Sequence, residues 1–92
     1  MMYHILPYTY RKAKQLGVKV VSSTRTGKKI DVYKNGKYIT SIGARGYYDY
    51  PFYLYHFGKT LADKKRRLYK LRHHKDRLIK NSRGWYADQL LW

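Results

Sequence analysis

The longest pattern of hydrophobic and polar positions in the chain runs from Lys59 to Lys80. On a helix, its aliphatic residues form one stripe about 100° wide, made of Leu61, Leu68, Leu71, Leu78 and Ile79. Basic residues recur on the opposite side of the same helix, namely Arg66, Lys70, His73 and Arg77. The pattern predicts a long amphipathic helix over residues 59–80 that packs its stripe on a core and turns its basic side to solvent or to a polyanion.

Two alternating runs on either side of Asn35 and Gly36 predict a β-hairpin. This dipeptide favours a two-residue type I′ turn, which sets Lys34 opposite Lys37, Tyr33 opposite Tyr38 and Val32 opposite Ile39. One face of the hairpin then carries Ile30, Val32 and Ile39, and the other carries Asp31, Tyr33, Tyr38 and Thr40. Because a lone hairpin is marginally stable, we expect residues 18–22 to add a third antiparallel strand, joined through a turn or loop over residues 22–29.

Shorter patterns lie at the two ends of the sequence. Residues 8–16 predict a short helix, with Thr9 as its N-cap and Gly17 as a left-handed C-terminal residue. Residues 1–6 show no clear pattern, and we expect a flexible arm there. Residues 84–92 predict one or two helical turns, whose indole side chains dock on the sheet, on the basic helix or on another subunit.

Aromatic residues gather between Gly43 and Gly58, where five tyrosines and two phenylalanines occur. Pro51 favours a short helix that starts from Asp49 or Tyr50 and ends at Gly58. We expect most of these rings to be buried or half-buried, because such a segment caps a core. The alternative is a platform of exposed rings on which the bases of single-stranded nucleic acid stack.

These elements together predict one α+β domain over residues 1–92. Its parts are a short N-terminal helix, a three-stranded antiparallel sheet, an aromatic segment, a long basic amphipathic helix and a C-terminal aromatic helix. Aromatic residues make up 17% of the chain, so the composition is that of a folded domain and not of a disordered basic tail.

The charge balance points to a polyanionic partner. The chain has 21 Lys and Arg against five acidic residues, all Asp, which gives a formal net charge of +16 and a pI near 10.2. Nucleic acid is the first candidate, because this is the electrostatic footprint of proteins that bind the phosphate backbone. The predicted contacts are Arg25, Lys28, Lys29, Arg45, Lys64, Arg66, Arg67, Lys70, Arg77 and Lys80.

Several kinds of chemistry lack the residues they need. Cysteine is absent, which excludes disulfides and thiolate ligands, and the N-terminus lacks the order of a secretory signal, so we expect the protein not to be secreted. His73 and His74 point about 100° apart on a helix, a poor geometry for one metal ion. We therefore expect no cofactor, no metal, no enzymatic activity and no membrane partner. Asp63 and Asp76 are expected to pair at i, i+4 spacing with Arg67 and Lys80.

Three segments, SIGARGYYDYPFYL, LADKKRRLYKLRHHKDR and SRGWYADQLLW, follow one another in a characteristic order. With them, the chain from about Pro7 onward resembles a family of small basic proteins encoded by large double-stranded DNA viruses of algae and amoebae. The resemblance implies a virus-encoded component that acts on DNA or is packaged with it, and it places the protein in the virion or in the host nucleus or cytoplasm.

The leading hypothesis is therefore a non-enzymatic protein that binds DNA, in preference to RNA, with little sequence specificity and serves genome condensation or packaging. One alternative is a structural or cementing protein of the virion, whose positive surface meets acidic capsid proteins and whose C-terminal aromatic residues bury at subunit contacts. A second alternative is a small nuclease or recombination accessory protein, which requires that the fold gather scattered aspartates around a divalent metal.

Overall fold

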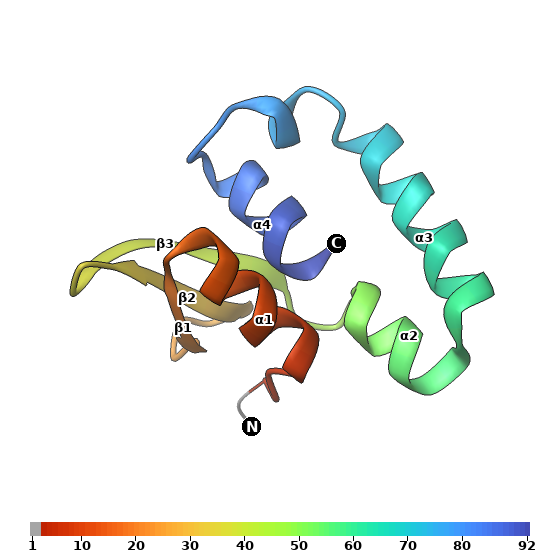
Figure 1. Ribbon diagram of the computed structural model, residues 1–92, viewed down its shortest axis with the longest axis horizontal. Helices are drawn as coiled ribbons and strands as arrows, with labels where there is room; N and C mark the ends of the chain where they lie inside the picture. The colour runs from red at the N-terminus through yellow and green to blue at the C-terminus, as the bar shows by residue number, and fades with distance from the viewer. Residues whose placement is uncertain (1–2) are drawn as a thin grey trace.

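The computed structural model describes residues 3–92. Its elements are α1 (Pro7–Leu16), β1 (Lys19–Ser22), β2 (Lys28–Lys34), β3 (Lys37–Ala44), α2 (Tyr50–Phe57), α3 (Lys59–Arg72), a 3₁₀ turn η1 (Asp76–Leu78) and α4 (Arg83–Leu91). The strands form one antiparallel sheet in the order β1-β2-β3, so the predicted α+β fold with a short N-terminal helix is confirmed. Figure 1 shows α1 and α4 together beside the sheet, and α2 and α3 on the other side of α4.

The hydrophobic core lies between one face of the sheet and the helices α1 and α4. Val20 lies opposite Val32 and Ile30 opposite Ile42 in neighbouring strands, so these four side chains share one face. The complete core cluster is Ile5, Ala13, Val20, Ile30, Val32, Ile42, Tyr86, Leu90 and Leu91. Because Ile5 is buried in this cluster, the expected arm over residues 1–6 is wrong for residues 3–6, and residues 1–2 lie outside the described residues.

The first and last helices are joined by hydrogen bonds. Thr9, the predicted N-cap, lies inside α1 instead, since the helix starts at Pro7. Its buried hydroxyl donates to the carbonyl oxygen of Leu90 at 2.9 Å, and the Tyr8 hydroxyl donates to the carbonyl oxygen of Trp92 at 3.4 Å. A residue that looks like a local cap in the sequence is thus used for a contact between the two ends of the described chain.

The hairpin turn has the predicted conformation. Asn35 and Gly36 have φ angles of 53° and 78°, and a type I′ turn requires positive φ at both positions. The predicted pair Tyr33 and Tyr38 is confirmed, and their rings meet edge to face with centroids 5.9 Å apart.

One residue beyond this pair the register departs from the prediction. Val32 lies opposite Thr40 and not opposite Ile39, because a β-bulge inserts one extra residue into β3. Ile39 is consequently 39% exposed, while Ile42 takes the core position on this strand with no exposed surface. The bulge shifts the alternation of side chains along β3 by one position, so that the β-branched Ile42 faces the core.

The predicted short helix in the aromatic segment is confirmed as α2. Its N-cap is Asp49, whose carboxylate accepts a hydrogen bond from the Phe52 backbone N–H at 3.1 Å. The expectation that most rings of this segment are buried or half-buried is wrong, since it holds only for Tyr50, Phe52 and Tyr53. The other four rings of the segment are exposed, with fractions of 74% for Tyr47, 51% for Tyr48, 75% for Tyr55 and 55% for Phe57.

The long basic helix ends earlier than predicted. α3 stops at Arg72, and the segment up to Lys80 turns back through η1. The reversal allows α4 to bury Leu90 and Leu91 on the sheet, which a helix continuing to residue 80 would carry away from it. At the corner Gly84 lies so close to η1 that a Cβ atom there would be 2.8 Å from the Cβ of Asp76.

The buried side of α3 also differs from the predicted leucine stripe. Ala62 and Tyr69 are its buried residues, and they lie two turns apart on one side of the helix. The predicted stripe is largely exposed, with fractions of 36% for Leu68, 69% for Leu71, 58% for Leu78 and 62% for Ile79. α3 packs on α2 through tyrosines and the stems of basic side chains, such as Arg66, whose guanidinium lies 4.0 Å from the Tyr50 ring centroid.

Among residues 3–92, no helix combines the length and the apolar character needed to cross a membrane.

Candidate nucleic-acid interface

All five aspartates already have a partner inside the protein. Asp49 lies 2.9 Å from Lys29, Asp63 lies 2.7 Å from Lys59, and Asp88 lies 2.7 Å from Lys70. The remaining two contact other polar groups: Asp31 accepts a hydrogen bond from Ser41 at 2.6 Å, and Asp76 lies 3.9 Å from the Nδ1 of His73.

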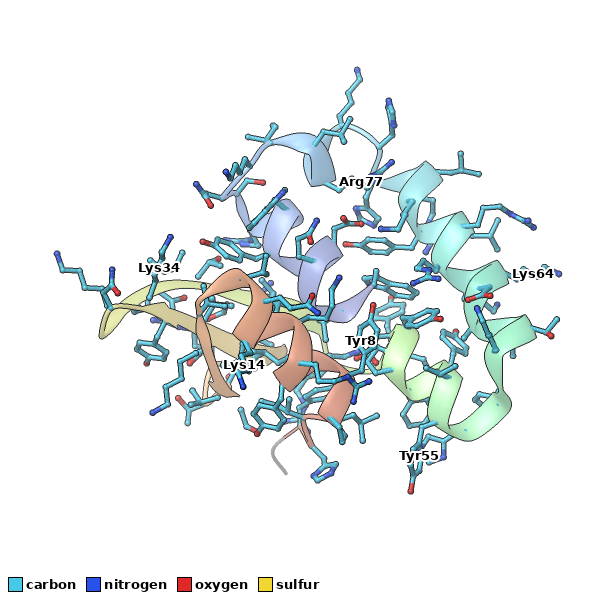
Figure 2. All side chains as sticks on the ribbon, viewed as in Figure 1. Tyr8, Lys14, Lys34, Tyr55, Lys64 and Arg77 are labelled. Carbon is cyan, nitrogen blue, oxygen red and sulfur yellow. The ribbon has the colours of Figure 1, made fainter. Side chains whose placement is uncertain are left out.

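Most basic side chains have no such partner. Of the 21 Lys and Arg, only Lys29, Lys59, Arg66 and Lys70 reach a carboxylate within residues 3–92, which leaves 17 without an ion pair in that part of the chain. Figure 2 shows Lys34 at one end of the molecule and Lys64 at the other, both directed outward. The positive field therefore surrounds the fold and is not neutralised internally.

One hollow on the outer side of α3 collects four of the ten predicted contacts. This outer hollow, of about 340 Å³, is lined by Asp63, Arg66, Arg67, Lys70, Leu71, His74 and Arg77. Although Arg77 lies beyond the end of α3, it returns to the helix, where its Nε donates to the carbonyl oxygen of Lys70 at 3.3 Å. Three members of the predicted row, Arg66, Lys70 and Arg77, thus stay together although the expected helix is broken. The prediction is wrong for the fourth member, His73, which stacks on Tyr69 and does not line this hollow.

The basic side chains of this row contact other groups of the protein itself. Arg66 contacts Asp63 at 3.3 Å and covers the Tyr50 ring, and Lys70 binds Asp88, whose side chain is only 5% exposed. The hydrogen bond from Lys59, and to a smaller extent the one from Tyr50, holds the pKa of Asp63 below its ordinary value. Burial, followed by the hydrogen bond to Asp63, raises the pKa of Tyr50, so this tyrosine remains a neutral donor.

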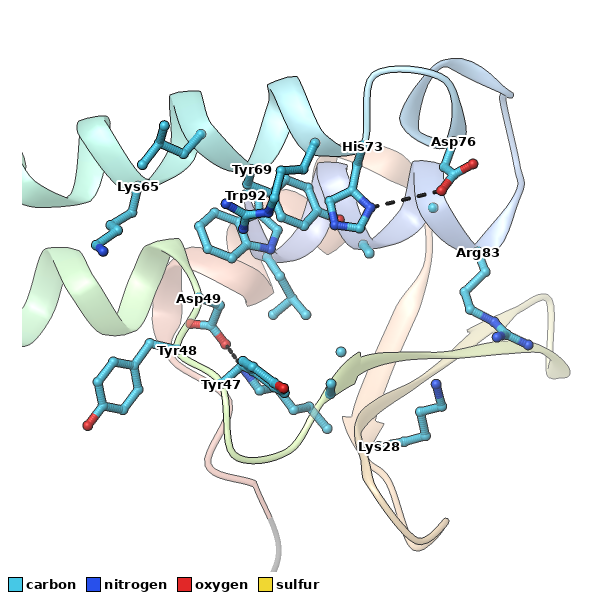
Figure 3. Close-up of a pocket in the computed structure, with 18 of the residues that line it drawn as sticks. Lys28, Tyr47, Tyr48, Asp49, Lys65, Tyr69, His73, Asp76, Arg83 and Trp92 are labelled. Atoms are coloured by element: carbon cyan, nitrogen blue, oxygen red, sulfur yellow. Dashed lines mark hydrogen bonds and ion pairs between the residues drawn. The ribbon is translucent and has the colours of Figure 1, made fainter.

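A larger depression lies on the inner side of α3, between this helix, α4 and the loop that follows β3 (Figure 3). This inner groove has a volume of about 770 Å³. Its walls carry four basic side chains without a carboxylate partner among residues 3–92, which are Lys28, Lys65, Arg72 and Arg83. They also carry five aromatic side chains, which are Tyr47, Tyr48, Tyr53, Tyr69 and Trp92.

The aromatic side chains of the inner groove are partly stacked on one another. Trp92 lies on Tyr69 with centroids 4.3 Å apart and planes 8° apart, and His73 covers the same tyrosine at 4.3 Å. The predicted docking of the C-terminal indole is thus confirmed for Trp92. Burial raises the pKa of Tyr69 to about 12, with smaller contributions from the negative charges of Asp88 and Asp76. The Tyr69 hydroxyl therefore remains protonated in this basic surface.

Lys29 borders the inner groove but is not available as a contact. Lys29 is only 5% exposed, and its ammonium lies 2.9 Å from the Asp49 carboxylate and 5.2 Å from the Tyr3 ring centroid. The Tyr3 hydroxyl donates to the same carboxylate at 2.6 Å, and burial raises the pKa of Tyr3. The prediction of a phosphate contact is therefore wrong for Lys29, which the fold uses to neutralise a buried aspartate.

The other predicted contacts are spread over the surface. Arg25, Arg45, Lys64 and Lys80 are exposed, and Arg25 covers the Tyr38 ring at 4.6 Å. The predicted pairs of Asp63 with Arg67 and of Asp76 with Lys80 are wrong. Asp63 contacts Lys59 and Arg66 instead, and the break after α3 leaves Asp76 near His73.

Sequence reasoning missed most of the inner groove. Of the ten predicted contacts, Lys28 and Lys29 line it, while Lys65, Arg72 and Arg83 were not among them. Lys65 and Arg72 are seven residues apart, a spacing that places both on one side of a helix and could have identified them. Arg83 gives no local signal, because the fold-back of α4 brings it to the groove.

Within residues 3–92 no three His or Asp side chains are gathered in a way that could hold a metal ion. In this part of the chain, the fold does not bring together the aspartates on which the nuclease alternative depended. No family model, curated protein or solved structure matches the chain.

Proposed function

We propose that the protein binds nucleic acid, DNA in the first place, through the phosphate backbone and with little sequence specificity. The observation that carries this proposal is the imbalance of pairing: every aspartate has a partner, whereas 17 of 21 basic side chains lack an ion pair within residues 3–92. A surface of this kind attracts a polyanion and releases the counterions condensed on it.

Binding to unrelated duplexes across a range of salt concentrations tests the proposal. Fluorescence anisotropy with two labelled duplexes of different sequence should give similar affinities. The logarithm of each affinity should fall linearly with the logarithm of salt, by about 0.9 for every phosphate neutralised. Absence of binding at low salt, or an affinity that salt does not change, would overturn the proposal.

The resemblance to proteins of large DNA viruses suggests a setting for this activity, namely the condensation or packaging of a viral genome. In that setting weak sequence preference is expected, because a packaging protein must cover DNA of any sequence.

A second function, that of a structural or cementing protein of a virion, is favoured by exposed aliphatic side chains. Leu71, Leu78 and Ile79 are 69%, 58% and 62% exposed, and apolar side chains gain little from contact with phosphates. Polyglutamate as a competitor separates the two functions. If it displaces the protein from DNA at an equal concentration of charges, an acidic protein is the better partner.

A further inference from the structure

We propose that the inner groove holds a short single-stranded segment of nucleic acid, with one base stacked on Tyr47. The adjoining phosphates contact basic side chains in the walls of the groove, which are Lys28, Lys65, Arg72 and Arg83. This inference rests on the proposed function and adds to it the form of the nucleic acid and the place where it binds.

Tyr47 offers a free aromatic face. Tyr47 is 74% exposed although it lines a concave surface, and no ring of residues 3–92 stacks on it. The adjacent Tyr48 differs, because one of its faces is covered by Phe52 at 4.2 Å with the planes 14° apart. An exposed ring beside unpaired cations is the arrangement that proteins use to stack the bases of single strands.

The basic side chains lie on both sides of this ring. In Figure 3, Lys65 lies at one end of the groove, Lys28 and Arg83 lie at the other end, and Tyr47 lies between them. A strand running along the groove therefore meets a cation before and after the stacked base. Of the two acidic residues that line the groove, Asp49 is neutralised by Lys29, and the four basic side chains outnumber the remaining carboxylate, that of Asp76.

The shape of the groove favours a single strand over a duplex. Its volume of about 770 Å³ is in the range of pockets that enclose small ligands, about 300–1,000 Å³, and suits individual nucleotides. In a duplex the faces of the bases are stacked on their neighbours, so a tyrosine in a recess cannot reach them without unpairing. An unpaired base in a single strand has both faces available.

Tyrosine substitutions test the site directly. Tyr47→Ala should weaken binding of oligothymidylate by roughly 5- to 150-fold, which is the usual effect of removing one stacking ring. Binding of a DNA hairpin duplex with the same number of phosphates should stay within about twofold. The matched control is Tyr55→Ala, since Tyr55 is 75% exposed but lies outside the groove, and it should leave both affinities within about twofold.

Tryptophan fluorescence gives an independent measurement. The chain has two tryptophans, so Trp85→Phe leaves Trp92 in the groove as the sole indole, and Trp92→Phe leaves Trp85 outside it. Oligothymidylate should change the emission of the first variant much more than that of the second. The double variant Arg72→Gln with Arg83→Gln should flatten the salt dependence for oligothymidylate by about 1.4, whereas Lys14→Gln with Lys34→Gln should not.

The outcomes separate this inference from the function beneath it. Equal effects of Tyr47→Ala and Tyr55→Ala, or a Trp92 emission that oligothymidylate does not change, overturn the groove as the site. In those cases salt-dependent duplex binding still supports the proposed function. Binding of neither single strand nor duplex at low salt overturns both.

Discussion

The two sides of α3 are both rich in basic residues, but the side chains are engaged to different degrees. In the outer hollow, Arg66, Lys70 and Arg77 contact a carboxylate, a tyrosine ring or a backbone carbonyl of the protein itself. In the inner groove, Lys65 and Arg72 reach no carboxylate among residues 3–92. In the outer hollow, Arg66 and Lys70 thus use their charge in ion pairs that hold the fold. In the inner groove, Lys65 and Arg72 form no ion pair among residues 3–92, although the Lys65 ammonium lies 5.7 Å from the Tyr53 ring centroid.

This difference teaches that a count of basic residues along a helix does not measure its capacity to bind phosphate. A cation already paired with a poorly exposed carboxylate must give up that partner before it can take another. A cation without a partner gives up only water and counterions.

The largest difference between the two sides is expected for leucines. Leu91→Ala should lower the free energy of unfolding by about 2–5 kcal/mol, because Leu91 is 1% exposed and its loss leaves a cavity beside the inner groove. Leu71→Ala in the outer hollow should change it by less than about 0.5 kcal/mol, because Leu71 is 69% exposed. Urea unfolding of both variants measures the contrast, and similar losses would contradict it.

A smaller contrast is expected for two lysines of α3. Lys70→Met should lower the free energy of unfolding by about 1–3 kcal/mol, because it leaves the Asp88 carboxylate, 5% exposed, without its cation. Lys65→Met makes the same change of side chain but removes no ion pair, so its effect on the free energy of unfolding should stay below about 0.5 kcal/mol. In a salt titration with oligothymidylate the order should reverse, and only Lys65→Met should flatten the slope. A flatter slope for Lys70→Met alone would transfer the binding site to the outer hollow.

Alkaline pH should destabilise both sides through tyrosines. The pKa of Tyr69 in the inner groove is raised to about 12 by burial, and that of Tyr50 near the outer hollow is raised as well. Above pH 10, the ordinary pKa of a tyrosine, the unfolded chain releases protons that the folded protein retains, so stability falls as the pH rises. Tyr69→Phe should reduce this fall, as urea unfolding on either side of pH 10 would reveal. An unchanged pH dependence would mean that Tyr69 ionises equally in both states.

The smallest effect on stability is expected for Asp63→Asn in the outer hollow. Its pairs with Lys59 and Arg66 are exposed to solvent, and such pairs contribute little. The pKa of Asp63 lies below its ordinary value, so whatever it contributes is lost as the pH falls through that lowered pKa. The substitution frees Arg66 from its carboxylate, which makes it a sensitive test of the binding site. The melting temperature and the affinity for oligothymidylate should both stay nearly constant, and a clear gain in affinity would indicate that the outer hollow binds phosphate.

The parts of the fold that were predicted from the sequence have short-range causes. The hairpin turn follows from Asn35 and Gly36, whose positive φ angles only a few residue types adopt readily. The start of α2 follows from Asp49 and Pro51, a cap and a residue suited to the first helical turn. In both cases neighbouring residues are sufficient to decide the backbone conformation.

The parts that could not be predicted depend on distant contacts. The pattern of residues 59–80 suits a continuous helix, and α3 ends at Arg72 because α4 returns to the sheet and Gly84 packs on η1. The same fold-back brings Arg83 into the inner groove. Tyr69 is buried in place of the leucines because Trp92, from the other end of the fold-back, stacks on its ring at 4.3 Å. Helical periodicity identifies an amphipathic stripe, but it does not say which neighbour will cover it.

The bonds that join α1 to α4 have a consequence for the order of events during synthesis. Thr9 and Tyr8 reach carbonyl groups 81 and 84 residues later, so the part of the core that α4 covers stays open until residues 90–92 have left the ribosome. A nascent chain that exposes Val20, Val32 and Ile42 in this interval is prone to associate with others of its kind. Because each copy carries a net charge of +16, electrostatic repulsion keeps such chains apart until the last helix closes the core.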